Sequence, residues 1–115
     1  MSQILFKLIE EAPWRLAEES GAFDGYGIDL TDGFIHLSTR EQVAETAALH
    51  FAGQPGLLLI SVDADALGDQ LKWEPSRGGV LFPHVHGQIP MSAVRGVEPL
   101  PVGPDGDHQF PWMTA

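Results

Sequence analysis

The sequence predicts a single α+β domain over residues 1–115, with two small, mostly antiparallel sheets and flanking helices. Two observations support this fold class. Strand-like and helix-like segments alternate through the N-terminal half, and several short strand-like segments then follow one another without helices between them. The length suits one hydrophobic core, and the chain contains no internal repeat or linker.

The N-terminal segment, residues 3–9, is predicted to be a strand because aliphatic and aromatic residues occupy alternate positions along it. Lys7 lies in its middle, either as an edge-strand lysine that discourages aggregation or as a basic residue that faces a cleft. Residues 13–20 are predicted to form a helix, with Pro13 in its first turn and Gly21 at its C-terminal stop. Its buried side is predicted to consist of Trp14, Leu16 and Ala17.

Residues 22–32 are rich in glycine and aspartate and are predicted to form a loop. The next segment, residues 33–39, is typical of a short strand that leads directly into a helix. Strand alternation places Phe34, His36 and Ser38 on the same face. An imidazole inside a strand is costly unless it finds hydrogen-bonding partners or faces a cleft, so His36 is the first candidate site residue.

Residues 39–52 are predicted to form a helix that ends at Gly53. The sequence from Ser38 to Glu41 has the S-x-x-E spacing of a capping box. Free backbone N–H groups at a helix start suit an anion such as a phosphate. Ser38 and Thr39 are therefore candidate ligand contacts.

The C-terminal half begins at residues 57–62 with a continuous apolar run, which is typical of a strand buried on both faces. A short strand is predicted at residues 71–74, followed by a turn at residues 77–79. A last strand is predicted near residues 93–97. From Pro99 onward the chain is rich in proline, glycine and aspartate, and we expect this tail to pack loosely.

The strand predicted at residues 80–87 contains a His-x-His sequence. Alternation places Phe82, His84 and His86 on one face, so both imidazoles point to the same side of the strand. Pro83 has no N–H to donate to a neighbouring strand. The strand is therefore predicted to lie at a sheet edge or to be interrupted.

The composition limits the possible partners and compartments. Six basic residues stand against sixteen acidic ones, for a formal net charge of −10 at pH 7, which argues against a nucleic-acid partner but permits a small anionic ligand. The absence of cysteine excludes disulfides, thiolate metal sites and a cysteine nucleophile. No apolar run approaches the roughly 18 residues of a membrane span, and no leader precedes the first strand, so we expect a cytoplasmic protein without a membrane partner.

The polar residues of three strands are candidates for one site, provided that the strands come together in the fold. The catalytic candidates are His36, His84 and Glu74. The ligand-binding candidates are Lys7, Ser38, Thr39, Arg77, Phe82 and His86.

Three further interpretations of these residues remain open. The three histidines with Glu74 would make a three-histidine, one-carboxylate metal site. One or two of the histidines would instead be buried hydrogen-bonding groups of the core. A serine hydrolase is less well supported, since Ser38 has neither a nucleophile-elbow sequence around it nor an evident acid partner.

Several of these motifs together resemble the bacterial domain-of-unknown-function family DUF952, over residues 3–110. The most specific parts of the pattern are Gly33-Phe-Ile-His-Leu-Ser38, Lys72-Trp-Glu74 and Phe82-Pro-His-Val-His-Gly87. That family commonly has a tyrosine where this chain has His86.

The order of motifs is also similar, more distantly, to the RNA 2′-phosphotransferases of the ADP-ribosyltransferase superfamily. These run from a His-Leu-Ser strand into an alanine-rich helix, a Gly-x-Pro turn and an apolar strand ending Val-Asp-Ala, found here at residues 36–38, 44–50, 53–55 and 57–64. The resemblance implies an ADP-ribosyltransferase-like fold whose two sheets enclose a cleft for NAD or an ADP-ribose-like nucleotide.

The same resemblance implies roles for individual residues. His36 and Ser38 would contact the adenosine or nicotinamide side of the ligand, and Lys7 would lie near the superfamily's first-strand basic residue. A ribosyl or N-glycosidic bond would be cleaved through an oxocarbenium-like centre, with His84 or Glu74 as general acid or base. The chief alternative is a non-catalytic module that binds a small ligand or a divalent metal through the three histidines.

Overall fold

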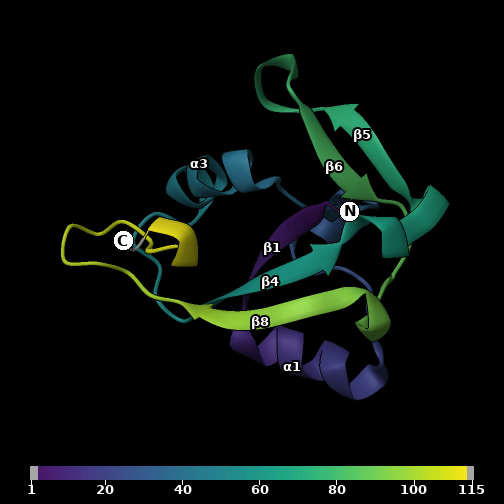
Figure 1. Ribbon diagram of the computed structural model, residues 1–115, viewed down its shortest axis with the longest axis horizontal. Coiled ribbons are helices and arrows are strands. Elements are labelled where there is room, and N and C mark those ends of the chain that lie inside the picture. Colours follow the sequence, from purple (N-terminus) through teal and green to yellow (C-terminus); the bar gives the residue numbers. More distant parts are fainter. Residues whose placement is uncertain (1–2, 114–115) are drawn as a thin grey trace.

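The computed structural model describes residues 3–113, with the side chains of Arg77 and Met113 excepted. Over this range the chain forms an α+β fold with three small antiparallel sheets (Figure 1). The predicted α+β class is confirmed. The prediction of two sheets is wrong, because the two-residue strands β2 (Ala22–Phe23) and β7 (Ile89–Pro90) pair only with each other.

The first sheet forms the centre of the domain, with strand order β1-β4-β8. Its strands are β1 (Ile4–Glu10), β4 (Leu57–Asp63) and β8 (Val94–Leu100). The apolar run of β4 is buried on both faces, as the sequence predicts, because α1 and α3 lie on opposite sides of the sheet (Figure 1). One core includes Leu5, Trp14 and Ile60, and the other includes Phe6, Leu59 and Phe110.

Helix α1 (Glu11–Ser20) starts two residues earlier than predicted and ends at Gly21, as predicted. Gly21 has a φ of 95°, a left-handed conformation that glycine adopts without steric cost. Trp14 and Ala17 are buried. The prediction that Leu16 is buried is wrong, since it is 67% exposed; it lies two residues from Trp14 and so points away from the core face.

The segment predicted as a loop contains a second helix, α2 (Ile28–Asp32). The loop prediction is wrong at this point. The helix has only five residues, which is too short for an apolar periodicity, and it lies between Gly27 and Gly33. Gly33 closes it by donating its backbone N–H to the Asp29 carbonyl at 2.9 Å.

The third sheet contains β3 (Ile35–His36), β5 (Leu71–Pro75) and β6 (Leu81–Val85) in the order β3-β6-β5. The edge alternative for β6 is wrong, since β6 is the central strand. Its pairing with β3 nevertheless stops at Pro83, as the alternative of an interrupted strand predicts. Pro83 accepts a hydrogen bond from the Leu37 N–H at 3.0 Å but has no N–H to return.

Two backbone hydrogen bonds join the first and third sheets. Phe6 N–H donates to the Ser38 carbonyl at 2.8 Å, and Ser38 N–H donates to the Phe6 carbonyl at 2.9 Å. This bridge brings β1 alongside the end of β3. It thereby places Lys7 and His36, which are 29 residues apart in sequence, within hydrogen-bonding distance of each other.

Helix α3 (Arg40–His50) lies within the predicted range of residues 39–52 and ends two residues before its predicted end. Its N-cap is Thr39, where the capping-box spacing predicts Ser38. The capping box pairs Thr39 with Gln42, because Ser38 is held in the extended bridge to Phe6. The Ser38 hydroxyl lies 3.1 Å from that of Thr46.

Replacing Thr39 by alanine is expected to lower the free energy of unfolding by about 1 kcal/mol, because the Gln42 N–H loses its hydroxyl acceptor. Urea unfolding of the wild type and of Thr39→Ala measures the loss. Thr39→Ser keeps a hydroxyl and serves as the control. Equal losses in both variants would contradict a capping role for the hydroxyl.

The remaining segments are four short 3₁₀ helices among residues 3–113, namely η1 (Ala64–Gln70), η2 (Arg77–Gly79), η3 (Met91–Ala93) and η4 (Pro111–Met113). The tail contributes to the core: Leu100 and Phe110 are buried, and Trp112 packs on Phe6 with ring centroids 5.0 Å apart. The exposed residues of the tail beyond β8 are those of its turn at residues 104–107, together with Pro101, Gln109 and Pro111. None of the helices in the described part of the chain is long and apolar enough to cross a membrane.

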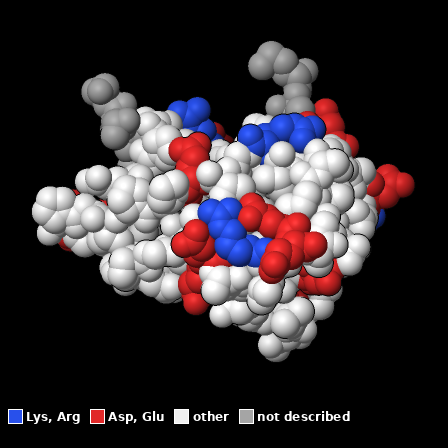
Figure 2. All heavy atoms as spheres, turned by 90° about the horizontal axis from the view of Figure 1, so that it is seen from below, with Lys and Arg blue, Asp and Glu red and all other residues white. Residues whose placement is uncertain are grey.

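Charged side chains on the molecular surface follow the acidic composition. On the face shown in Figure 2, basic side chains are few and lie next to acidic ones. On α1, for example, Arg15 forms ion pairs with Glu11 at 3.2 Å and Glu18 at 2.8 Å.

Candidate functional site

The three predicted histidines lie around the ring of Phe34, on one face of the third sheet. The Phe34 centroid is 4.7 Å from that of His36, 4.2 Å from that of His84 and 5.3 Å from that of His86. His36 and His84 are opposite each other in the register of β3 and β6, with ring centroids 5.4 Å apart. We call Phe34, His36, Glu74, His84 and His86 the histidine face.

One end of the histidine face is anchored by a buried ion pair. Lys7 Nζ lies 2.7 Å and 3.0 Å from the two carboxylate oxygens of Asp29, and 3.1 Å from the His36 carbonyl. Lys7 is 8% exposed and Asp29 is 2% exposed. These contacts use all three ammonium donors of Lys7. Lys7 therefore links Asp29 to the His36 backbone and has no free donor to offer a ligand.

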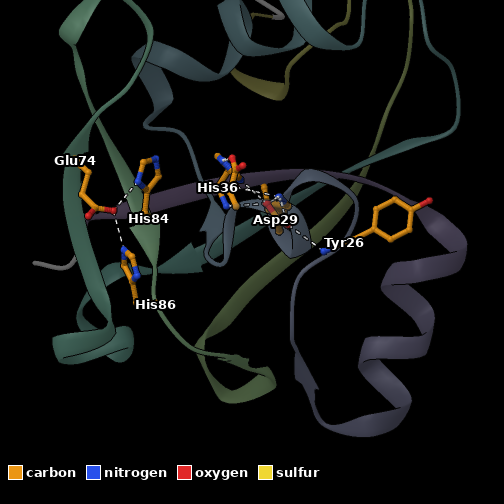
Figure 3. Close-up of polar contacts among 8 residues, drawn as sticks. Tyr26, Asp29, His36, Glu74, His84 and His86 are labelled. Atoms are coloured by element: carbon orange, nitrogen blue, oxygen red, sulfur yellow. Dashed lines mark hydrogen bonds and ion pairs between the residues drawn. The ribbon is translucent and has the colours of Figure 1, made fainter.

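Asp29 orients His36. Its carboxylate accepts hydrogen bonds from the backbone N–H groups of Tyr26 at 3.1 Å and His36 at 3.0 Å, and lies 2.7 Å from His36 Nδ1 (Figure 3). Burial alone raises the pKa of Asp29, but the hydrogen bond from His36 and the charge of Lys7 outweigh it and lower the pKa to about 2. The ionised carboxylate can only accept, so His36 Nδ1 must carry a proton.

The second ring nitrogen of His36 faces another carboxylate. Nε2 lies 2.9 Å from Asp32 Oδ2, at the end of α2. Asp29 and Asp32 act as acceptors when ionised, so each ring nitrogen of His36 that carries a proton donates to one of these carboxylates. Burial lowers the pKa of Lys7, although the neighbouring Asp29 carboxylate opposes that change.

At the other end of the face, one carboxylate oxygen joins two histidines. Glu74 Oε1 lies 2.8 Å from His84 Nδ1 and 2.7 Å from His86 Nε2 (Figure 3). The hydrogen bonds from His86 and His84 lower the pKa of Glu74. Glu74 and His86 are each 39% exposed at the side chain, whereas His84 is 5% exposed, so a ligand can reach the carboxylate and one imidazole directly.

The other predicted ligand contacts are either buried or not described by the structure. The Ser38 and Thr39 side chains are buried and are engaged by Thr46 and Gln42 of α3. Phe82 is the cross-strand partner of Glu74 and shares its face of the sheet, as alternation with His84 predicts, but its side chain is buried. The side chain of Arg77 lies outside the described part of the structure, so its predicted contact with a ligand stays a prediction.

The geometry does not assemble a metal site in the described part of the chain, where no group of three or more His, Asp or Glu side chains is placed to hold an ion. The three imidazoles pack against the Phe34 ring. His36 turns a nitrogen onto Asp29, whereas His84 and His86 each turn one onto Glu74 Oε1. This is the arrangement of hydrogen-bonded imidazoles.

The molecule also has a hollow on a different side, between α3 and the C-terminal turn. Its volume is about 310 Å³, and its lining includes Ala44, Ala48, Asp107 and Phe110. None of the residues predicted from the sequence to form the site lines this hollow. Its lining also includes His108, which is buried and contacts the Gln54 carbonyl at 2.9 Å through Nε2. We therefore take the histidine face as the candidate site.

Three residues of this arrangement were not predicted as site residues, namely Asp29, Asp32 and Phe34. For Phe34 the signal was present, because strand alternation places it on the same face as His36. For the two aspartates, the only signal was their closeness in sequence to His36, in a segment whose composition indicates a loop.

Acid is expected to destabilise the fold through Asp29. Its pKa is lowered from 3.8 to about 2, so the folded state binds this proton less readily than the unfolded chain. The resulting stability, about 2 kcal/mol, is fully present above about pH 4 and is lost as the pH falls toward 2. Glu74, whose pKa is also lowered, contributes in the same direction.

Urea unfolding between pH 5 and pH 2 measures this effect. We expect Asp29→Asn to flatten the pH dependence relative to the wild type, whereas Asp69→Asn, at an exposed residue of η1, should leave it unchanged. An unaltered slope in Asp29→Asn would contradict the assignment.

Comparison with known proteins identifies the family. Residues 8–97 match the model of the family described as protein of unknown function (DUF952). No curated protein matches the chain. The crystal structure of protein CC0527 from Caulobacter crescentus is similar at 45% identity and a TM-score of 0.87, over 92% of this chain and 93% of that chain. The solution NMR structure of CC0527 is similar at 44% identity and a TM-score of 0.85, over 97% of each chain. The protein therefore belongs to the DUF952 family.

Proposed function

We propose that this protein binds NAD or an ADP-ribose-like nucleotide on the histidine face and cleaves or transfers its ribosyl group. The observation that carries the proposal is the convergence of three imidazoles and the Glu74 carboxylate around one aromatic ring. An aromatic ring with adjoining imidazoles suits the stacking of a base or a nicotinamide. The sequence resemblance to the ADP-ribosyltransferase superfamily points to the same class of ligand.

Glu74 is suited to the reacting centre. Two imidazole donors fix its orientation and lower its pKa, so it is ionised at neutral pH while remaining open to solvent. An ionised carboxylate stabilises the positive charge of an oxocarbenium-like ribosyl carbon. Glu74 therefore acts as an electrostatic stabiliser and as an acceptor for the attacking hydroxyl, and not as a general acid.

The bond changes follow from these positions. The bond between the ribosyl carbon and the leaving nitrogen breaks, and nicotinamide leaves as a neutral base with the electron pair. An oxygen of water or of an acceptor hydroxyl then bonds to the ribosyl carbon, and its proton passes to the Glu74–His84–His86 group. His36, fixed by Asp29, orients the ligand.

A thermal-shift screen of the chelator-treated protein tests the proposal, because a ligand that binds only the folded state raises its unfolding midpoint. We expect NAD or ADP-ribose at about ten times its Kd to add about 1.4 kcal/mol to the unfolding free energy. His86→Tyr should keep this shift, and His36→Ala should lose it. A shift with zinc alone would favour the metal-binding alternative for the three histidines. No shift with either nucleotide would contradict the proposal.

A further inference from the structure

We infer that His36 Nε2 is the phosphate-binding group of the site, and that Asp32 occupies this position until the phosphate of a ligand displaces it. The inference rests on the proposed function, since it names the part of the nucleotide that His36 recognises. It comes from the charges and contacts around the ring.

When His36 is protonated on both ring nitrogens, the charges around it leave one positive charge to be neutralised. Lys7 and the protonated ring are then positive and Asp29 is negative, and these three groups are in direct contact. The buried carboxylate thus balances only one of two cations. Asp32 supplies the second negative charge, at 2.9 Å from Nε2. Without Asp32, the Nε2–H would be a positively charged donor facing solvent.

Asp32 differs from Asp29 in how firmly it is held. Asp29 is 2% exposed and accepts from Lys7, from two backbone N–H groups and from His36. The Asp32 side chain is 36% exposed, and its contact within the described part of the chain is the one with His36. An exposed ion pair of this kind contributes little free energy, so another anion can replace it.

The position of Asp32 in α2 favours exchange as well. Asp32 is the last residue of the helix, where the backbone carbonyls make a negative charge unfavourable. Gly33 follows with a φ of 82° and, apart from its chain neighbours, has open space where a side chain would lie. A phosphate presents the same acceptor oxygens as the carboxylate and carries more charge, so it is the better partner for the imidazolium.

This arrangement also explains how an acid-rich protein could discriminate among anions. The formal charge of −10 repels anions in general, and Asp32 competes with them for His36 Nε2. A ligand must bring enough additional contact, such as a base stacked on Phe34, to displace the carboxylate. The pyrophosphate of an ADP-ribose-like nucleotide, which is joined to a base, meets this requirement.

Binding of inorganic pyrophosphate and of ADP-ribose to wild type and variants tests the inference, with the His36 ring signals followed by ¹H–¹⁵N NMR. We expect Asp32→Ala to bind both probes about fivefold more tightly than the wild type, because the competing ion pair is removed. Asp69→Asn removes one negative charge from an exposed residue elsewhere and controls for net charge. It should change affinity far less than Asp32→Ala does.

The outcomes separate the inference from the proposed function. Tighter pyrophosphate binding by Asp32→Ala, with shifted His36 signals, supports the phosphate site whatever the result with ADP-ribose. If ADP-ribose binds no better than pyrophosphate, that result counts against the proposed function. Unchanged or weaker pyrophosphate binding by Asp32→Ala, or binding that leaves the His36 signals in place, overturns the inference. Circular dichroism shows whether the variant is folded, and Asp32→Asn provides a second variant that keeps the side-chain shape.

Discussion

Replacing Asp29 by asparagine is expected to lower the free energy of unfolding by about 3 kcal/mol. The change leaves the Lys7 ammonium buried without a counter-charge, and it removes the ionised acceptor that His36 Nδ1 contacts. Loss of one partner of a buried ion pair is costly because the remaining charge stays in a poorly hydrated place. The loss is a large share of the stability of a domain of this size.

Replacing Lys7, the other partner of the ion pair, should lower the free energy of unfolding by less. In Lys7→Met the Asp29 carboxylate keeps the hydrogen bonds from the Tyr26 and His36 backbone N–H groups and from His36 Nδ1. The double variant Lys7→Met with Asp29→Asn should be less destabilised than the sum of the single variants, since neither buried charge remains. Urea unfolding of the three variants at pH 7 gives the coupling free energy. An additive result would show that the ion pair does not hold the site in place.

The second large effect concerns ligand binding. Replacing His36 by alanine is expected to weaken NAD or ADP-ribose binding at least about tenfold, because a hydrogen bond from a charged donor contributes about 1.5–3 kcal/mol. Stability should fall by less than in Asp29→Asn, since Asp29 keeps Lys7 and two backbone N–H groups as partners. Isothermal titration calorimetry and urea unfolding of the same preparation separate the two effects.

His50→Ala is the matched control for this variant, because His50 lies exposed at the end of α3, away from the third sheet. It should leave both affinity and stability unchanged. If His36→Ala lost much stability and no affinity, His36 would be a structural residue, as one of the sequence interpretations holds.

Strand alternation was the most informative sequence signal. It placed Phe34 with His36, and His84 with His86, and the structure shows all four rings together. Alternation gives the face of each strand but not which strands are neighbours. The pairing of His36 with His84 depends on the register of β3 and β6. This register cannot be predicted from sequence when one of the strands has only two residues.

The residues that orient the site were harder to predict. Asp29 belongs to a five-residue helix, and its main partner, Lys7, is 22 residues away on another strand. The composition of this segment, rich in glycine and aspartate, predicted a loop. The predicted number of sheets was wrong for a similar reason, because β2 and β7 have two residues each and show no periodicity. Tertiary contacts, and not local sequence, decide these short elements.

A ¹H–¹⁵N NMR titration of the protein with ADP-ribose locates the ligand site. We expect shifts in the signals of Phe34, His36, His84 and His86, with little change at α3 and the C-terminal turn. Shifts confined to the hollow between α3 and that turn, or no shifts at ligand concentrations that saturate known nucleotide sites, would contradict the assignment of the histidine face as the ligand site.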